Sequence, residues 1–226
     1  MVPRSCLVAR RASTVTPVVT LPELLIAAEA GDLPPPDGGL TVVGQGNPRV
    51  AAVLAFTAHN VVVTDLDPSW VRGQLPPDDL SAPLNPPFLS VLCEKLGRRV
   101  NNIDLIALAP GLPGPPPLAL TLVEDRNHHP RVVRALRYRD DVSVWTVGGG
   151  MVLLGRGLGG RWETAVEVSP SHRGQGLGRA LAVAARHLVP EGRSVWAQIA
   201  PGNAASVRAF LAAGYLPVGA EALLVR

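Results

Sequence analysis

Two glycine-rich stretches of the sequence have the residue types and spacing to hold a phosphate-bearing ligand. The first, GRGLGG, spans residues 155–160, and the second, RGQGLG, spans residues 173–178. Glycine permits positive φ angles and lets a ligand come close to backbone N–H groups, which a phosphate-binding loop requires. Glycine is also common in hairpin turns, so the flanking elements must decide which stretch could bind a ligand.

The flanking patterns separate the two stretches. Residues 155–160 fit G-x-G-x-x-G, but the alternating RWETAVEV that follows predicts a strand, whereas a dinucleotide fingerprint must open a helix. We therefore interpret this stretch as a hairpin turn. Residues 173–178 follow that strand and precede GLGRALAVAARHL, whose apolar spacing predicts a helix. A helix start favours anions, although a purely structural turn is the alternative for this stretch taken alone.

The second stretch is not a P-loop, because Arg179 and Ala180 stand where that motif ends in lysine and a hydroxyl residue. Together with its surroundings, VEVSPSHRGQGLGRAL resembles motif A of the GNAT superfamily of N-acetyltransferases, whose signature is Arg/Gln-x-x-Gly-x-Gly/Ala. Downstream, NAASVRAFLAAGY resembles motif B of the same superfamily. The residues in the motif positions are Arg173, Gly176 and Gly178 for motif A, and Asn203, Ser206, Phe210, Gly214 and Tyr215 for motif B.

The resemblance covers about residues 142–226 and implies a fold and a function. The implied fold is α/β, with a mixed, largely antiparallel central sheet flanked by helices. The implied reaction moves an acetyl or short acyl group from acyl-CoA to an amine by direct attack in a ternary complex, with acetyl-CoA as co-substrate and no metal. The strand around Glu167 and Val168 would pair with the pantetheine arm and splay from residues 194–200. The implied coenzyme-binding residues are Val168, Arg173, Gly174, Gln175, Gly176, Leu177, Gly178, Arg179, Asn203, Ser206 and Phe210.

The acid and base of the reaction are less defined. Phe210 stands where motif B often has a tyrosine that protonates the leaving thiolate, so Tyr215 is the candidate acid, with core packing as its alternative role. Glu163 and Glu167 lie on one face of the strand before motif A and are candidate bases; either could instead be a surface or salt-bridged residue. Because Phe210 cannot donate a proton, a non-catalytic acyl-CoA-binding or sensing module is the alternative function. Histidine candidates with no spacing that ties them to the site are His59, His128 and His129.

The elements that must position these residues follow from apolar periodicity and turn residues. Thr20 and Glu23 have capping-box spacing at the start of a helix that Gly31 ends. Residues 48–58 are compatible with either a helix or a strand. Further helices are predicted at 87–99, 129–139, 176–188 and 203–214. Strands are predicted at 40–43, 60–66, 103–109, 118–124, 142–147, 151–157, 161–169, 194–200 and 222–225.

The Pro/Gly-rich segment 109–120 is the best internal boundary. We predict a flexible tail over 1–18, an N-terminal α/β region over 19–125 and the acetyl-CoA-binding domain over 126–226. The N-terminal region would wall the acceptor cleft. One possibility for it is a degenerate second copy of the acetyltransferase fold, without a coenzyme site of its own.

Composition excludes several classes of protein. The hydrophobic fraction of 47% with 17% charge indicates a folded globular protein, and no apolar run reaches the ~20 residues of a membrane span. A net charge of +3 comes from scattered arginines, and with 4% aromatic residues we do not expect nucleic-acid binding. Cys6 and Cys93 are interpreted as ordinary thiols. A cytoplasmic bacterial protein acting on a small-molecule or protein amine is expected.

Overall fold

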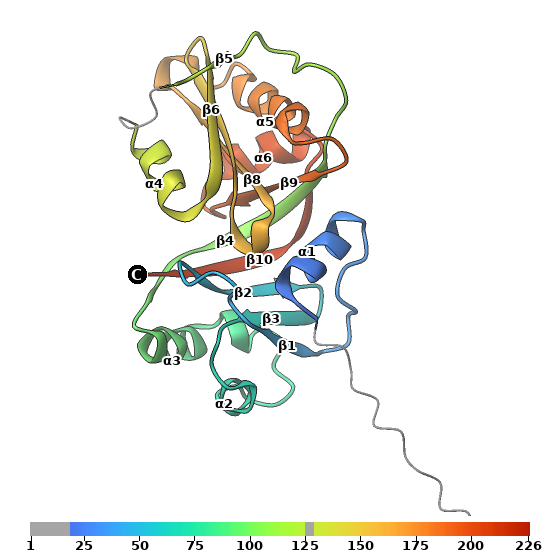
Figure 1. Ribbon diagram of the computed structural model, residues 1–226, viewed down its shortest axis with the longest axis vertical. Coiled ribbons are helices and arrows are strands. Elements are labelled where there is room, and N and C mark those ends of the chain that lie inside the picture. The colour runs from blue at the N-terminus through green and yellow to red at the C-terminus, as the bar shows by residue number, and fades with distance from the viewer. Residues whose placement is uncertain (1–18, 125–128) are drawn as a thin grey trace, which may run out of the picture.

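The computed structural model describes residues 19–124 and 129–226 (Figure 1), so the predicted tail, Cys6 and His128 lie outside the described residues. Ten strands form one sheet in the order β1-β3-β2-β10-β4-β9-β8-β7-β6-β5. Only the neighbours β1/β3 and β8/β9 are parallel in this sheet, which confirms the predicted mixed, largely antiparallel arrangement. The strands are β1 (Leu40–Val43), β2 (Ala51–Phe56), β3 (His59–Val63), β4 (Arg99–Pro110), β5 (Thr121–Leu122), β6 (Asp140–Val147), β7 (Gly150–Arg156), β8 (Trp162–Val168), β9 (Ser194–Ile199) and β10 (Leu216–Val225).

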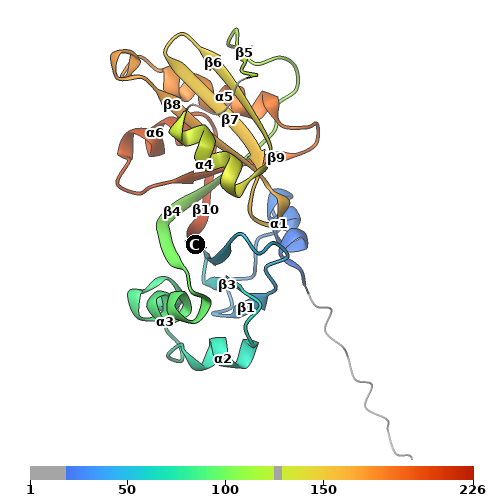
Figure 2. The same cartoon turned by 60° about the vertical axis from the view of Figure 1, so that its left-hand side comes forward.

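Helices cover both faces of the sheet. They are α1 (Leu21–Glu29), α2 (Pro68–Gly73), α3 (Pro86–Leu96), α4 (Pro130–Tyr138), α5 (Leu177–Leu188) and α6 (Ala204–Ala212), with 3-10 segments η1 (Ala82–Leu84), η2 (Leu158–Gly160) and η3 (Pro170–His172). Figure 2 shows α4 and α5 on opposite sides of β7: α4 packs against Leu153 and Ala165, whereas α5 packs against the alternate residues Val152 and Val166. In the described part of the chain, no helix is long and apolar enough to cross a membrane.

Local patterns account for most of these elements. The Thr20 capping box forms at the start of α1, whose apolar stripe is buried. Residues 48–58, compatible with a helix or a strand by sequence, contain β2, which forms a hairpin with β3. The GRGLGG stretch is the turn between antiparallel β7 and β8, as predicted. A Cβ on Gly159, which has φ +60°, would lie 2.6 Å from Leu25 Cδ1, so this turn packs directly on α1.

The C-terminal strand β10 lies in the middle of the sheet, between two strands from the N-terminal part of the chain. The last strand was predicted at 222–225, but β10 spans ten residues and lies between β2 and β4. In turn, β4 pairs with β9 of the C-terminal part. The sheet therefore runs continuously through both predicted regions (Figure 1). The strand predicted at 118–124 is only two residues long, because only Thr121 and Leu122 pair with β6.

Candidate active site

The loop between β8 and α5 holds the motif A residues at the start of a helix. Gly174 and Gly176 have φ angles of +77° and +83°, and Gly176 is the N-cap of α5. A Cβ at either glycine would meet nothing within 4 Å, so backbone conformation, not lack of space, favours glycine there. No side chain of the described residues caps α5. Its first N–H groups are therefore available to an anion.

The remaining motif A side chains shape this loop or face solvent. Arg173 Nε donates a hydrogen bond to the Val168 carbonyl at 3.2 Å, and Gln175 Nε2 donates to the Ser171 carbonyl at 3.2 Å. Arg179 is exposed, so it adds positive charge beside the helix start. Leu177 packs on β7 and β8, and a Cβ on Gly178 would lie 3.7 Å from Val168 Cγ2. The predicted motif A set is therefore gathered around one helix start.

A cavity of about 310 Å³ lies where β8 and β9 separate. The two strands are in register only at Glu163–Trp196 and Thr164–Ala197, so β8 residues 165–168 have β7 on one edge and no strand on the other. This separation was predicted from the family resemblance and is confirmed. Residues from β8, β9, α4 and α6 line the cavity, which is therefore walled from both faces of the sheet.

The motif B residues reach the same cavity from α6. Asn203 Oδ1 accepts a hydrogen bond from the Ser206 N–H at 3.1 Å, which caps the helix. Asn203, Ser206 and Phe210 all line the cavity. Phe210 is also buried in the core, where its ring meets that of Tyr215 edge to face at 4.9 Å between centroids. Motif B thus lines the cavity, and motif A adjoins motif B, because a Cβ on Gly178 would lie 3.8 Å from Ala209 Cβ of α6.

Tyr215 is not placed to act as the catalytic acid, which corrects the prediction. Its side chain is 1% exposed, and its hydroxyl donates a hydrogen bond to the Ala182 carbonyl of α5 at 3.1 Å. Burial strongly raises the pKa of this phenol. The alternative role of core packing is therefore correct for Tyr215.

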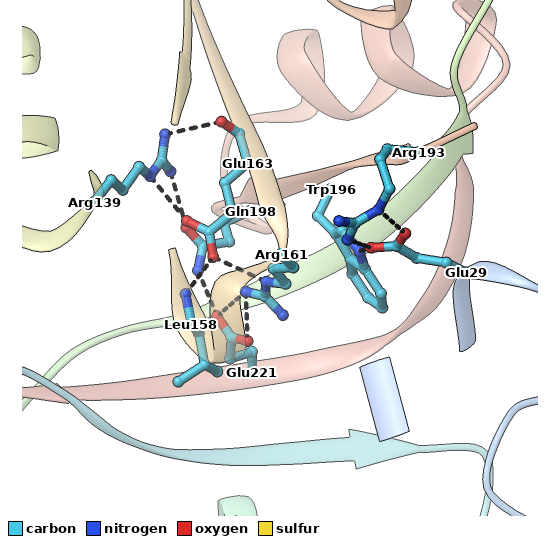
Figure 3. A network of polar contacts seen from close by, with 9 residues as sticks. All are labelled: Glu29, Arg139, Leu158, Arg161, Glu163, Arg193, Trp196, Gln198 and Glu221. Carbon is cyan, nitrogen blue, oxygen red and sulfur yellow. Dashed lines mark hydrogen bonds and ion pairs between the residues drawn. The ribbon is translucent and has the colours of Figure 1, made fainter. Parts of the chain in front are cut away.

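Glu163 lines the cavity but is not a free base, which corrects a second prediction (Figure 3). Its carboxylate is 2.8 Å from Arg161 Nε and 2.8 Å from Arg139 Nε, and it accepts a hydrogen bond from the Leu158 N–H. Burial opposes its ionisation, but the guanidinium groups of Arg161 and Arg139 outweigh burial and lower the pKa of Glu163. A carboxylate held in this way is a poor proton acceptor.

The ion pairs of Glu163 extend into a buried network that joins three strands. Arg161, fully buried, also pairs with Glu221 of β10 at 2.7 Å, and Gln198 of β9 hydrogen-bonds to Glu221. The Arg161 guanidinium lies 5.0 Å from the Trp196 ring centroid. Figure 3 shows these side chains converging between the strands. Arg139 and Arg161 both pair with Glu163, and Arg161 also pairs with Glu221, whose pKa is raised by burial.

Glu167 lies outside the cavity. Its carboxylate is 2.7 Å from Arg131 Nε and 3.5 Å from His129 Nε2, and the hydrogen bond from Arg131 is the main cause of its lowered pKa. Glu167 lines a second, open hollow beside Gly148 and Gly149 instead. The structure therefore does not bring this predicted base to the cavity. His59 is remote as well, because it joins Thr41 and Asp37 in the N-terminal part of the chain.

Asp104 is a cavity residue that the sequence analysis did not select. It projects from β4 into the cavity wall and accepts a hydrogen bond from Asn102 Nδ2 at 2.6 Å. Burial raises the pKa of Asp104, and the Asn102 hydrogen bond and the charge of Arg134 oppose that shift only in part. The available signal was an acid within the strand NNIDLIALA, but its position in one cavity with the motif B residues requires the β4–β9 pairing.

Comparisons with known proteins agree with the residue patterns. A model of the acetyltransferase (GNAT) family matches residues 110–215. The chain is similar in structure to a GCN5-related N-acetyltransferase from Kribbella flavida, with 18% identity, a TM-score of 0.40 and coverage of 61% of this chain and 63% of that chain. The similarity thus spans less than two thirds of that protein's length. A GNAT-family acetyltransferase structure from Novosphingobium aromaticivorans is 16% identical, with a TM-score of 0.39 and coverage of 57% and 68%. No curated protein sequence matches this chain significantly.

Proposed function

Because a model of the GNAT acetyltransferase family matches residues 110–215, we propose that the chain transfers an acetyl or short acyl group from acyl-CoA to an amine. The observation that carries this proposal is the cavity between β8 and β9, which is lined by motif B residues of α6, and α6 adjoins the uncapped start of α5 at Gly178. Such an arrangement offers one site for a coenzyme and an acceptor together.

The residues present fit a coenzyme A thioester. The N–H groups at the start of α5, with Arg173 and Arg179 beside them, suit a pyrophosphate. The edge of β8 at residues 165–168 offers backbone groups to the amides of a pantetheine arm. When bound there, the coenzyme supplies an activated acyl group at the cavity.

The side chains of the cavity then orient the acceptor and handle its proton. An ammonium must lose a proton before its nitrogen can act as a nucleophile. Of the two cavity carboxylates in the described residues, Glu163 is held by two guanidinium groups, whereas Asp104 has no ion pair within 4 Å. We therefore assign Asp104 as the group that takes the amine proton. Phe210 excludes water and offers no proton to a leaving sulfur.

Two measurements test this proposal. Calorimetry with coenzyme A should detect binding, and thiol release from acetyl-CoA across a panel of amines should exceed the background rate. Asp104→Asn, which keeps size and hydrogen bonding, should lower kcat at least tenfold and leave coenzyme A affinity unchanged. If coenzyme A does not bind, or if Asp104→Asn leaves kcat unchanged, the proposal is wrong in its coenzyme or in its base.

A non-catalytic acyl-CoA-binding module is the second candidate. It is favoured by Phe210 at the usual tyrosine position and by the Tyr215 hydroxyl, which is occupied by the Ala182 carbonyl. This function predicts tight coenzyme A binding with no thiol release above background for any amine.

A further inference from the structure

The charged side chains of the cavity come from α4, β4 and β8. Helix α4 and strand β4 lie on either side of the gap between β8 and β9. Arg131, Arg134 and Arg139 come from α4 and its C-terminal cap, Glu163 comes from β8 and Asp104 comes from β4. Which of these charges can meet a ligand depends on the ion pairs they already make.

Two of the three arginines are already paired. Arg139 Nε lies 2.8 Å from Glu163 Oε2, and Arg131 Nε lies 2.7 Å from Glu167 Oε2. Glu163 shares its second oxygen with the buried Arg161. These groups largely cancel one another, so they contribute little net charge toward a ligand.

Arg134 and Asp104 remain. Within residues 19–124 and 129–226, Arg134 forms no ion pair; its guanidinium lies 5.6 Å from the centroid of Tyr138 and its side chain is exposed. Asp104 is half-buried across the gap and receives a hydrogen bond only from the neutral Asn102 among these residues. The cavity therefore presents one available cation and one available carboxylate from opposite sides.

We propose that the acceptor is a small zwitterionic amine, whose anionic group is bound by Arg134 and whose amino group is bound by Asp104. This inference rests on the proposed function and names its substrate class. A bare diamine would place a second positive charge beside Arg134, and a bare alkylamine would leave Arg134 without a partner. A carboxylate or a phosphate matches the planar fork of arginine donors.

The size of the cavity agrees with a small acceptor. A volume of about 310 Å³ lies at the lower end of the range of small-molecule sites. The ammonium first gives one proton to Asp104. The neutral nitrogen then forms its bond to the acyl carbon, the carbon–sulfur bond breaks with its electron pair left on sulfur, and the second nitrogen proton passes to that thiolate, so coenzyme A leaves as the free thiol. Arg134 holds the other end of the acceptor and undergoes no change in this step.

A matched acceptor series tests the proposal. With acetyl-CoA as donor, ω-amino acids of two to six carbons are each compared with the alkylamine and the diamine of the same length, and with the corresponding aminoalkyl phosphate. The best amino acid or aminoalkyl phosphate should exceed its alkylamine and its diamine at least tenfold in kcat/KM. The ratio between the two anionic series identifies carboxylate or phosphate as the natural group.

Charge reversal on α4 gives the decisive comparison. Arg134→Glu should lower kcat/KM for the best zwitterion at least tenfold and raise it for the diamine, with coenzyme A affinity unchanged. Arg137→Glu is the matched control, because Arg137 is exposed on the same helix and also stacks on Tyr138 but does not line the cavity. It should leave both values within twofold.

Alkylamines turned over as fast as zwitterions, or an unchanged preference in Arg134→Glu, would overturn this inference and leave the proposed function intact. Coenzyme A binding without turnover of any amine would instead overturn both. Arg134→Gln, which removes the charge without reversing it, should show the same loss for zwitterions if Arg134→Glu does not fold.

Discussion

The strand-to-helix junction before α2 is closed by a carboxylate, whereas the junction before α5 has no side-chain cap. Asp67 Oδ1 accepts hydrogen bonds from the Ser69 and Trp70 N–H groups at 2.9 and 3.0 Å. At α5 the N-cap is Gly176, which has no side chain to offer. The two junctions have the same order of elements, yet only the second leaves its N–H groups to a ligand.

Three other helices of the described residues resemble α2 in this respect. Side chains of Thr20, His129 and Asn203 cap α1, α4 and α6. Helix α3 starts with Pro86 and Pro87, which have no N–H groups to satisfy. Helices α3 and α5 are thus the α-helices of the described residues without a side-chain cap, and of these two only α5, at the motif A residues, begins with residues that carry N–H groups. A helix start without a side-chain cap, in a chain where most helices have one, is better evidence of a ligand site than glycine content alone.

Both junctions are expected to belong to one cooperatively unfolding structure. Arg161→Met tests this expectation and should have the largest effect of the variants. Removing this guanidinium leaves Glu163 and Glu221 buried without it, so we expect a loss of about 3–5 kcal/mol in the free energy of unfolding. Urea unfolding followed by fluorescence and far-UV circular dichroism should give one coincident transition. Two separate transitions would contradict a shared structure.

A surface ion pair provides the control for Arg161. Arg49 lies 2.6 Å from Asp140, and this pair also joins the N-terminal and C-terminal parts, but both side chains are partly exposed. Arg49→Met should therefore cost less than about 1 kcal/mol.

Gly176→Glu tests the open junction directly. A carboxylate at the start of α5 should compete with the pyrophosphate and lower coenzyme A affinity at least tenfold, or about 1.4 kcal/mol, by calorimetry. Gly176→Ala is the matched control, since it carries the same penalty for a positive φ without the charge. Equal affinities for the two variants would show that charge at this position does not matter, and the assignment of the anion site would fail.

Asp67→Ala opens the closed junction. Loss of the cap should cost about 1 kcal/mol of stability in urea unfolding, because two N–H groups lose their acceptor. Coenzyme A affinity should not change, because this junction has no role in binding. Weaker coenzyme A binding by Asp67→Ala would contradict the expectation that only the junction before α5 takes part in binding.

The smallest expected effect concerns the pH dependence of Asp104→Asn. Folding raises the pKa of Asp104. The folded state therefore binds the proton of the Asp104 carboxyl group more tightly than the unfolded chain does, and it is destabilised when Asp104 ionises. Asp104→Asn should thus be more stable than the parent at neutral pH, by on the order of 0.5 kcal/mol. This advantage should shrink as pH falls below the raised pKa and disappear below the ordinary value of 3.8.

The pH dependence expected for Asp104 reflects the charged groups around it. Arg134 and Arg131 face it from α4, and Glu221 is its cross-strand neighbour on β10. Urea unfolding of both proteins from pH 3 to pH 8 measures the difference. A parent that is more stable than Asp104→Asn at pH 7 would contradict a destabilising carboxylate.

Features that depend on local pattern could be predicted from the sequence. The turn at residues 155–160, the helix after Gly176 and the cap at Asn203 follow from neighbours within a few residues. Pairing across the sheet is not local. The length of β10 comes from partners more than a hundred residues away, so only its last four residues were identifiable as a strand.

The same limit explains the errors in the site. Glu163 and Glu167 were correctly placed on one strand, but their arginine partners come mostly from α4, and the spacing of RVVRALRYR gives no contact by itself. Asp104 was missed because its strand pairs with β9 rather than with a neighbour in sequence. Tyr215 was chosen for its hydroxyl, whose partner on α5 also could not be inferred from the sequence.

The position of β10 has a consequence for how the chain folds. Residues 216–225 are synthesised after every other strand of the sheet, yet they fill the place between β2 and β4. Until they arrive, β2 presents an unpaired edge of the kind that recruits other chains. Contacts of such long sequence separation slow folding, and the N-terminal strands cannot complete their sheet alone. We therefore expect the chain to fold as one unit once β10 has been synthesised, and to depend on chaperones until β10 has paired with β2 and β4.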